Sequence, residues 1–449
     1  MSSRFLFPAT LATLVLATPA AVVAQPVDSR LASQIQPGNG LTSDEVARRS
    51  RGTSPELAAR QQEIAAAQAA VDQARAAYIP QLTGTARYTR ISAIDQPEDL
   101  PFPIEVLQNQ TDFEARLTVP LSDFLLRVPH ATASARHAAR AAGETAAATA
   151  RDVEIEGRDL YYDWVRARLQ TIVFEQSLET ARSHLDDSKK AFAVGTSSKA
   201  DVLQVESSVA QNELVLQRTR HLAELHEGRL RIAMHDTTGA PYIIGEDVLA
   251  ELPAAAQNAE ALAAQAIDRR EELRAFTFNA ESLRERADLS RAGYFPRLDL
   301  VAGAQYANPN PRAFPQTDEF SSSWDVTVQL SWTPTDIPAS RAAARESEHR
   351  ADALAAQRNQ AADAIRVEVL AAVQSVKDAV SSIEASAKTI VTAEEAHRVR
   401  RALFQNGRAT SLELSDAELE LTRARFENVN ARVDLRVALA RLERAIAAR

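Results

Sequence analysis

The stretch Trp324-Asp325-Val326-Thr327-Val328-Gln329-Leu330-Ser331-Trp332 alternates apolar and polar residues at every step. A period of two predicts a β-strand with one apolar and one polar face. The apolar face begins and ends with an indole, and at about 3.3 Å per residue the two indoles lie about 26 Å apart. An outer-membrane strand carries an apolar band about 25 Å tall, edged by aromatic residues. We therefore expect the tryptophan face to meet lipid and the polar face to line water.

Three other stretches alternate in the same way and predict further strands, at residues 82–89, 113–119 and 298–306. Tyr88 and Tyr306 lie on their apolar faces, and we expect them to join Trp324 and Trp332 in an aromatic girdle. Polar, proline-bearing loops at residues 92–111 and 308–323 connect the strands in pairs.

The composition of the 449 residues is typical of long packed helices, with 5% aromatic residues, 25% charged residues, only 13 Gly and many runs of alanine. The net charge of -9 gives no basis for binding nucleic acid. Because the chain has no cysteine, it has no thiolate nucleophile, redox pair, thiolate zinc site or lipid-attached N-terminal cysteine.

The N-terminus predicts export. Arg4 is followed by an apolar run, and small residues lead to a cleavage site after Ala24, so residues 1–24 read as a signal peptide. Residues 25–53 are polar and turn-prone, and we expect them to be extended or partly ordered. No later run reaches the roughly 18 apolar residues of a membrane-spanning helix, so strands must enter any membrane.

Helical patterns fill most of the remaining chain. Ser54 and Pro55 begin the first helix, as N-cap and first helical residue, and Pro80 ends it. Longer helices are expected at residues 124–192, 199–235, 254–294, 339–404 and 412–449. A helix of about 70 residues would be about 100 Å long. Heptads of apolar residues predict coiled-coil seams, at Val202, Val209, Leu216, Ala223 and Leu230, and at Ala417, Ala424, Ala431, Ala438 and Ala445.

The chain also repeats itself. Tyr78-Ile79-Pro80-Gln81-Leu82 is matched by Tyr294-Phe295-Pro296-Arg297-Leu298, and the turn at Gly195 is matched by the turn at Gly407. We therefore expect two structural repeats, residues 54–253 and 254–449, each with the order helix, strand, strand, long helix, turn, helix.

These lengths predict an architecture. Each long helix equals two shorter ones, so we expect helix 199–235 to stack end to end on helix 254–294, and the C-terminal helix to stack on the helix that begins at Ser54. Four strands cannot close a barrel, and an open edge in lipid would leave backbone groups unpaired. Three chains would supply twelve strands. The expected fold is mainly α, with long antiparallel coiled-coil helices in an α-barrel and four strands per chain in a shared trimeric transmembrane β-barrel.

The signal sequence, the Tyr-x-Pro-x-Leu before a strand in both halves, the paired strands and the Phe-x-x-Gly turns resemble the outer-membrane efflux protein family, the TolC-like exit ducts. The resemblance covers the whole mature chain. It implies a homotrimer in the outer membrane of a Gram-negative bacterium, with a helical tunnel through the periplasm and both strand loops outside the cell. It also implies a passive duct for efflux or type I secretion, with a periplasmic adaptor, an inner-membrane pump and no cofactor.

The resemblance assigns site residues near the turns. The acidic positions six and nine after the turn glycine would face the tunnel and constrict it, and these are Glu413 and Asp416, with Asp201 in the first half and Arg408 beside the second turn. Acidic residues in a first helical turn also favour the helix dipole, which is the alternative interpretation. Two turns, Val194-Gly195-Thr196 and Asn406-Gly407-Arg408, would be the docking surface for an adaptor.

An enzyme is not expected. The eight histidines are scattered, with no metal-binding motif, and His130 and His137, one heptad apart, are interpreted as polar residues of a helix face rather than metal ligands. No glycine-rich phosphate loop or ordered triad is present. A soluble periplasmic coiled-coil adaptor is the alternative function, but it would have no use for tryptophan at both ends of a strand of membrane length. The polar duct lining favours no substrate among drugs, dyes, metal ions and secreted proteins.

Overall fold

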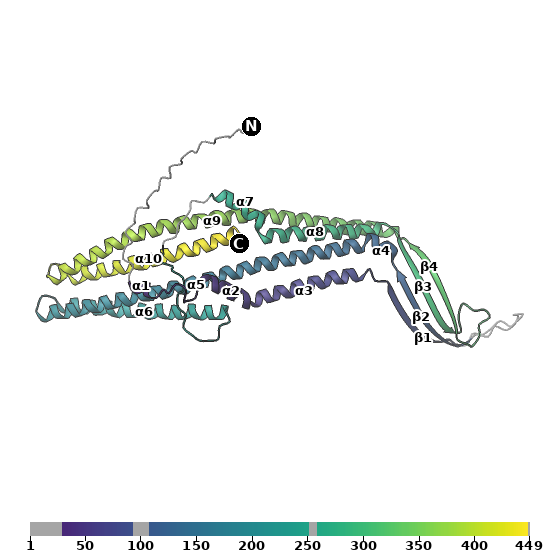
Figure 1. Ribbon diagram of the computed structural model, residues 1–449, viewed down its shortest axis with the longest axis horizontal. Coiled ribbons are helices and arrows are strands. Elements are labelled where there is room, and N and C mark those ends of the chain that lie inside the picture. The colour runs from purple at the N-terminus through teal and green to yellow at the C-terminus, as the bar shows by residue number, and fades with distance from the viewer. Residues whose placement is uncertain (1–28, 93–106, 251–257, 448–449) are drawn as a thin grey trace, which may run out of the picture.

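The computed structural model describes residues 29–92, 107–250 and 258–447. The expected signal peptide, the first residues of the expected extended segment, most of the first strand loop and residues 254–257 lie outside them. The described chain is elongated, with a bundle of long helices at one end and a sheet at the other (Figure 1).

One antiparallel sheet contains four strands in the order β1-β2-β3-β4. They are β1 (Gln81–Arg90), β2 (Asn109–Val119), β3 (Arg297–Asn308) and β4 (Ser321–Ser331). All four predicted strands are confirmed, and Trp332 directly follows β4. Within the described residues β1 and β4 are the two free edges, so this sheet is open.

The helices follow the predicted repeat. The first half contains α3 (Pro55–Ala76), α4 (Leu121–Leu126), α5 (Val128–Ala193) and α6 (Lys199–Ala233). The second half contains α7 (Ala259–Arg269), α8 (Glu271–Arg291), α9 (Ile337–Gln405) and α10 (Ser411–Ala445), with short 3-10 turns η1 (Ala292–Tyr294) and η2 (Pro334–Asp336) beside the strands. Ser54 caps α3 as expected, because its hydroxyl accepts the N–H of Leu57 at 3.3 Å.

The segment expected to be extended or partly ordered is helical over much of its described length. It forms α1 (Ser29–Ser33) and α2 (Ser43–Thr53). Thr42 caps α2, whose Val46 is fully buried. The helix is stabilised by packing on α5 at Gly157, where a Cβ would lie 3.3 Å from the Cα of Ala47. This close approach is a tertiary contact that local composition does not reveal.

The expected single helix before β3 is broken between α7 and α8. Arg270, at the break, has an extended backbone (φ -64°, ψ 125°) and a buried side chain. Its guanidinium pairs with Glu272, at 3.0 Å, and with Glu368 of α9. The break thus coincides with an arginine that turns inward to bind two carboxylates, because a buried charge needs partners.

The predicted stacking of the short helices was also wrong. α8 and α10 both pack between α5 and α9, and α3 and α6 lie in line along the opposite side of α5 (Figure 1). The physical reason lies in the connection after α6. Ile244 bridges to Ile35 and Leu41, and the carbonyl of Asp247 then accepts a hydrogen bond from Arg436 of α10 at 2.5 Å. The connection therefore carries the chain across α5.

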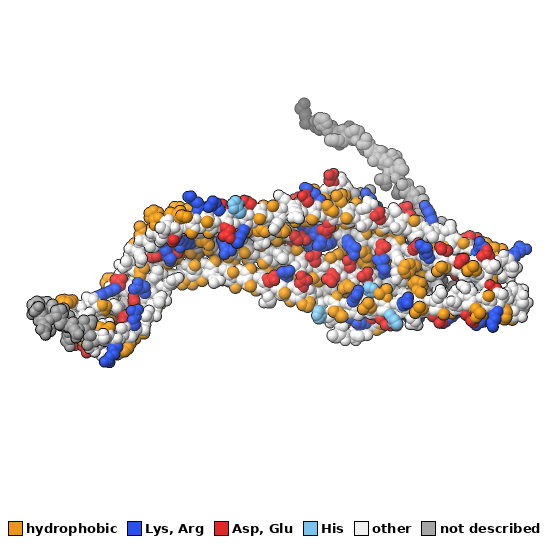
Figure 2. All heavy atoms as spheres, turned by 180° about the vertical axis from the view of Figure 1, so that it is seen from behind, with side chains coloured by type: hydrophobic (Ala, Val, Ile, Leu, Met, Phe, Trp, Pro, Cys, Tyr) orange, Lys and Arg blue, Asp and Glu red, His pale blue; other side chains and the backbone are white. Residues whose placement is uncertain are grey.

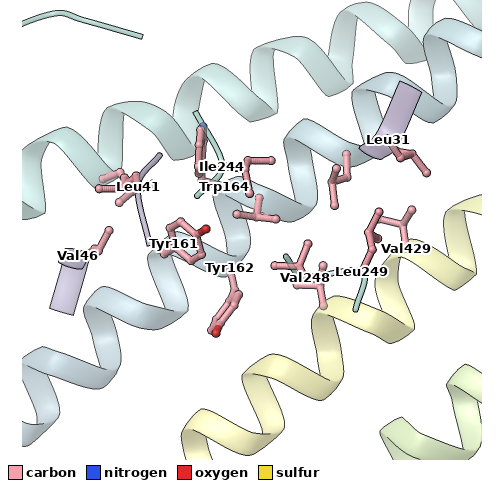
Figure 3. Close-up of a cluster of buried hydrophobic side chains, with 14 of the residues drawn as sticks. Leu31, Leu41, Val46, Tyr161, Tyr162, Trp164, Ile244, Val248, Leu249 and Val429 are labelled. Carbon is pink, nitrogen blue, oxygen red and sulfur yellow. The ribbon is translucent and has the colours of Figure 1, made fainter. Parts of the chain in front are cut away.

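The main core lies in the middle of the helical bundle, where this connection crosses (Figure 3). Tyr161 and Trp164 of α5 are fully buried there, with Val46, Ile244 and Val248 packed around them. The Tyr162 hydroxyl donates to Glu246 at 2.9 Å. In the predicted α10 seam Ala424, Ala431, Ala438 and Ala445 are buried, and Ala417 is half-buried. Small side chains let these helices approach closely.

Candidate functional site: the helical turns and the sheet faces

The two turns between long helices lie together at the end opposite the sheet (Figure 1). Gly195 has φ +79° and Gly407 has φ +68°, a conformation that other residues rarely adopt. Each glycine N–H donates to the carbonyl of the phenylalanine three residues earlier, at 3.0 Å to Phe192 and 2.9 Å to Phe404. The next N–H in each turn donates to a carbonyl five residues back. This is the Schellman end of a helix, formed twice.

Each turn is followed by a capping box. Ser198 accepts the N–H of Asp201 at 3.2 Å, and the Asp201 carboxylate accepts the N–H of Ser198 at 2.9 Å. Thr410 and Glu413 repeat this arrangement at 3.3 and 2.9 Å. The Ser198 hydroxyl, which donates to the Asp201 carboxylate at 2.7 Å, and the Ser198 N–H lower the pKa of Asp201. The Thr410 N–H lowers the pKa of Glu413, and Arg400, at 2.9 Å, adds to this effect. Two of the expected constriction carboxylates therefore stabilise helix N-termini in this chain.

Asp416 and Arg408 differ from the capping residues. Asp416 lies on the exposed face of α10, and no side chain in the described part of the chain pairs with it. The Arg408 side chain is exposed, while its backbone N–H closes the second turn on the carbonyl of Leu403 at 2.8 Å. Among the expected constriction carboxylates, Asp416 is thus the one that can interact with solvent or with ions.

A groove of about 840 Å³ lies between the two turns. Residues from both turns line it, among them Lys190, Val194, Asp201, Phe404, Arg408 and Glu413. The structure therefore brings the expected docking turns and three of the four expected constriction residues to one surface. Val194 is 75% exposed, so the first turn presents an apolar side chain to solvent.

His184 is a residue that the sequence patterns did not single out. Its side chain is 1% exposed, with Nδ1 lying 3.1 Å from the carboxylate of Glu418 and Nε2 lying 3.0 Å from the hydroxyl of Ser411. The ring packs edge-on against Phe404. One side chain of α5 therefore contacts both helices of the second hairpin. The sequence does carry one signal for its burial, since His184 follows Leu178 and Ala181 at helical spacing and so continues their buried stripe.

The two faces of the sheet separate apolar from polar side chains. All four expected girdle residues are exposed, with exposed fractions of 78% for Trp324, 58% for Trp332, 64% for Tyr88 and 50% for Tyr306. Tyr306 stacks on Phe320 with ring centroids 5.1 Å apart. The register pairs Ala304 with Trp324, so the aromatic residues share one face of the sheet.

The opposite face carries charged and polar residues that bind one another. Gln305 donates to Asp112 at 2.7 Å, and Arg312 pairs with Asp325 at 2.6 Å. This face suits contact with water, whereas the aromatic face suits contact with lipid. Along the helices, acidic and basic side chains are intermixed over the face seen in Figure 2, which has no large basic patch for nucleic acid.

None of the described helices is both long and apolar enough to cross a membrane. Among the described residues, one group could hold a metal ion, formed by His130, Glu285 and Asp288.

The chain is similar to known proteins over most of its length. The Outer membrane efflux protein family matches residues 46–233 and 262–448, one match in each half. Outer membrane protein TolC of Vibrio cholerae serotype O1 is 23% identical over 410 residues, which cover 90% of each chain.

Solved channel structures share the fold. CusC superposes with a TM-score of 0.78 at 16% identity, covering 90% of this chain and 91% of the other. The Campylobacter jejuni CmeC outer membrane channel superposes with a TM-score of 0.74 at 12% identity, covering 91% and 89%. The predicted fold class is confirmed. The family match over both halves shows that this chain belongs to the outer membrane efflux proteins, which are outer-membrane channels with a large periplasmic part rather than enzymes.

Proposed function

We propose that this chain forms a homotrimeric exit duct that carries substrates across the periplasm and outer membrane, in partnership with a periplasmic adaptor and an inner-membrane pump. Such a duct is passive, because energy is supplied at the inner membrane. It serves a tripartite efflux system or a type I secretion system.

The open sheet is the observation that carries this proposal. Its aromatic face is exposed from Trp324 to Trp332, and its edges, β1 and β4, have no neighbour within the described residues. In lipid each unpaired backbone group costs several kcal/mol, so the edges must pair with other copies. Three copies give twelve strands, an even number within the range of outer-membrane barrels.

The helical turns are the proposed docking end. The groove between Gly195 and Gly407 is open to solvent and lined from both halves, which suits the tip of an adaptor hairpin. Docking there would act on the adjacent capping residues, Asp201 and Glu413, and on Arg408. We assign the constriction to this end, with Asp416 as its free carboxylate.

A soluble coiled-coil adaptor is the less favoured function. It would leave the aromatic face of the sheet in water, although monomeric soluble proteins rarely expose apolar patches of more than a few hundred Å². The exposed residues Trp324, Val326, Val328, Leu330 and Trp332 form one continuous stripe. The stripe therefore favours a membrane protein.

Crosslinking between strand edges tests the trimer. The chain has no cysteine, so introduced thiols react without background. Thr85→Cys on β1 is combined with cysteine at Asp325, Thr327 or Gln329 on β4, which scans the unknown register between copies. A short bis-maleimide added to outer-membrane vesicles should yield a covalent trimer for at least one pair.

The single variants are the matched controls. In a closed barrel of three copies, identical positions lie four strands apart, so Thr85→Cys alone should remain monomeric under denaturing electrophoresis. A ladder that continues beyond three chains, or monomers for every pair in the scan, would refute the closed trimer.

A further inference from the structure

Three side chains that can bind a metal meet where α5 and α8 run antiparallel near the sheet. His130 lies in the first turn of α5, and Glu285 and Asp288 lie in the last two turns of α8. The Nδ1 atom of His130 is 2.7 Å from a carboxylate oxygen of Glu285. One ligand atom from each of the three residues lies within 4.8 Å of the other two.

We propose that these residues bind a divalent transition-metal ion, of which zinc is the best representative. Zinc binds imidazole nitrogen and carboxylate oxygen at about 2.0–2.2 Å, with three protein ligands and one open position for water in many sites. Tetrahedral coordination places ligand atoms about 3.3–3.6 Å apart. Entry of the ion therefore moves His130 and Glu285 apart by less than about 1 Å, with the Asp288 oxygen close enough to take the third position.

The surrounding charges favour a divalent cation. Arg291 pairs with Asp288 and with Glu348 of α9. Asp288 and Glu348 thus share one guanidinium, and Glu285 contacts the His130 ring, so these groups together carry a net negative charge when His130 is neutral. Arg291 contacts Oδ1 of Asp288, so Oδ2 can bind the ion. A bound divalent ion would neutralise the group.

The next heptad supplies an internal comparison. Nδ1 of His137 lies 2.9 Å from the carboxylate of Glu281, which repeats the histidine–glutamate pair on the same two helices. This second pair belongs to no three-residue group among the described residues. Ser134 and Ser282 bond between the two pairs, at 2.9 Å from each hydroxyl to the other residue's carbonyl. These bonds hold the helix register independently of His130.

The test measures zinc binding to the purified mature protein in detergent, after treatment with a chelator. Isothermal titration with zinc chloride should give one ion per chain, a ratio that does not depend on the number of chains in the assembly. His130→Ala and Asp288→Asn should each weaken binding by about tenfold or more, since loss of even an outer partner of a metal ligand commonly costs that much.

Two variants distinguish a metal site from a histidine–glutamate pair that only stabilises the helix contact. Asp288→Asn keeps the His130–Glu285 contact, so a loss of zinc affinity in this variant reports ligation and not misfolding. His137→Ala removes the matched pair and should leave the affinity unchanged. Absence of stoichiometric binding, wild-type affinity in the His130→Ala variant, or an equal loss in the His137→Ala variant would overturn the proposal.

Discussion

Nδ1 of His184 on α5 lies 3.1 Å from the carboxylate of Glu418 on α10, and its other ring nitrogen binds Ser411. His184→Leu leaves Glu418, which is 14% exposed, without this partner. Because a buried acceptor that loses its partner costs about 1–3 kcal/mol, the start of α10 should open more readily. Faster amide hydrogen exchange at residues 411–418 checks this.

The control for this prediction is His221→Leu, a change of the same kind on the exposed face of α6. It should leave exchange at the start of α10 unchanged. Equal exchange rates in both variants and the wild type would mean that His184 does not hold the two hairpins together.

Gly407→Val should disturb the second turn, because valine resists the positive φ that Gly407 adopts. A Cβ at this position meets no atom within 4 Å, so the strain comes from the backbone alone. We expect loss of efflux with assembly retained, measured by drug accumulation and by native electrophoresis. Gly407→Asn is the matched control, since asparagine tolerates the left-handed region, and it should retain efflux. Normal efflux in the valine variant would argue against docking at this turn.

Asp416→Asn should reduce cation selectivity if three copies of this carboxylate meet at the constriction, because a ring of carboxylates attracts cations. The reversal potential of the trimer in planar bilayers under a salt gradient measures the change. Asp434→Asn, an equally charge-removing change on the exposed face of α10, is the comparison and should have a smaller effect. A wild-type reversal potential in the Asp416 variant would place the constriction elsewhere.

Acidification should loosen the second turn. Hydrogen bonding to Thr410, aided by Arg400, holds the pKa of Glu413 below its usual value of 4.5. Since its folded pKa is the lower one, the stabilisation is complete above about pH 4.5 and is lost as pH falls through the folded pKa. Hydrogen exchange at residues 411–414 should accelerate over that acidic range. Glu413→Gln should remove this pH dependence, and an unchanged pH profile in that variant would contradict the assignment.

Val328→Arg should prevent stable insertion, because residue 328 lies midway between Trp324 and Trp332 on the exposed apolar face. Arginine at the middle of the lipid face of a barrel costs about 2–4 kcal/mol. Thr327→Arg changes the neighbouring residue on the polar face and should be tolerated. Heat resistance of trimers on electrophoresis checks the pair. Equal stability of the two variants would contradict the assignment of the faces.

The sequence alone determined the features that depend on local periodicity. The period of two predicted a strand at residues 324–332, and β4 spans Ser321–Ser331. The heptads in α10 predicted the burial of Ala424, Ala431, Ala438 and Ala445. Gly195 and Gly407 marked the turns, because only glycine readily adopts their positive φ. These signals are readable because each residue's place follows from its nearest neighbours in the chain.

Only the tertiary structure decided which distant segments meet. The helix at Ser43–Thr53 forms against Gly157, and the break at Arg270 accompanies contact with Glu368. The crossing of the chain over α5, which changed the expected stacking, depends on contacts of residues 244–249 with the α1–α2 connection, with α2 and with α10. His184 and His130 likewise acquire partners from helices more than 150 residues away in the chain. In such contacts a polar side chain can be buried only because a distant segment supplies its hydrogen-bond or ion-pair partner. A local sequence pattern does not show which distant segment that is.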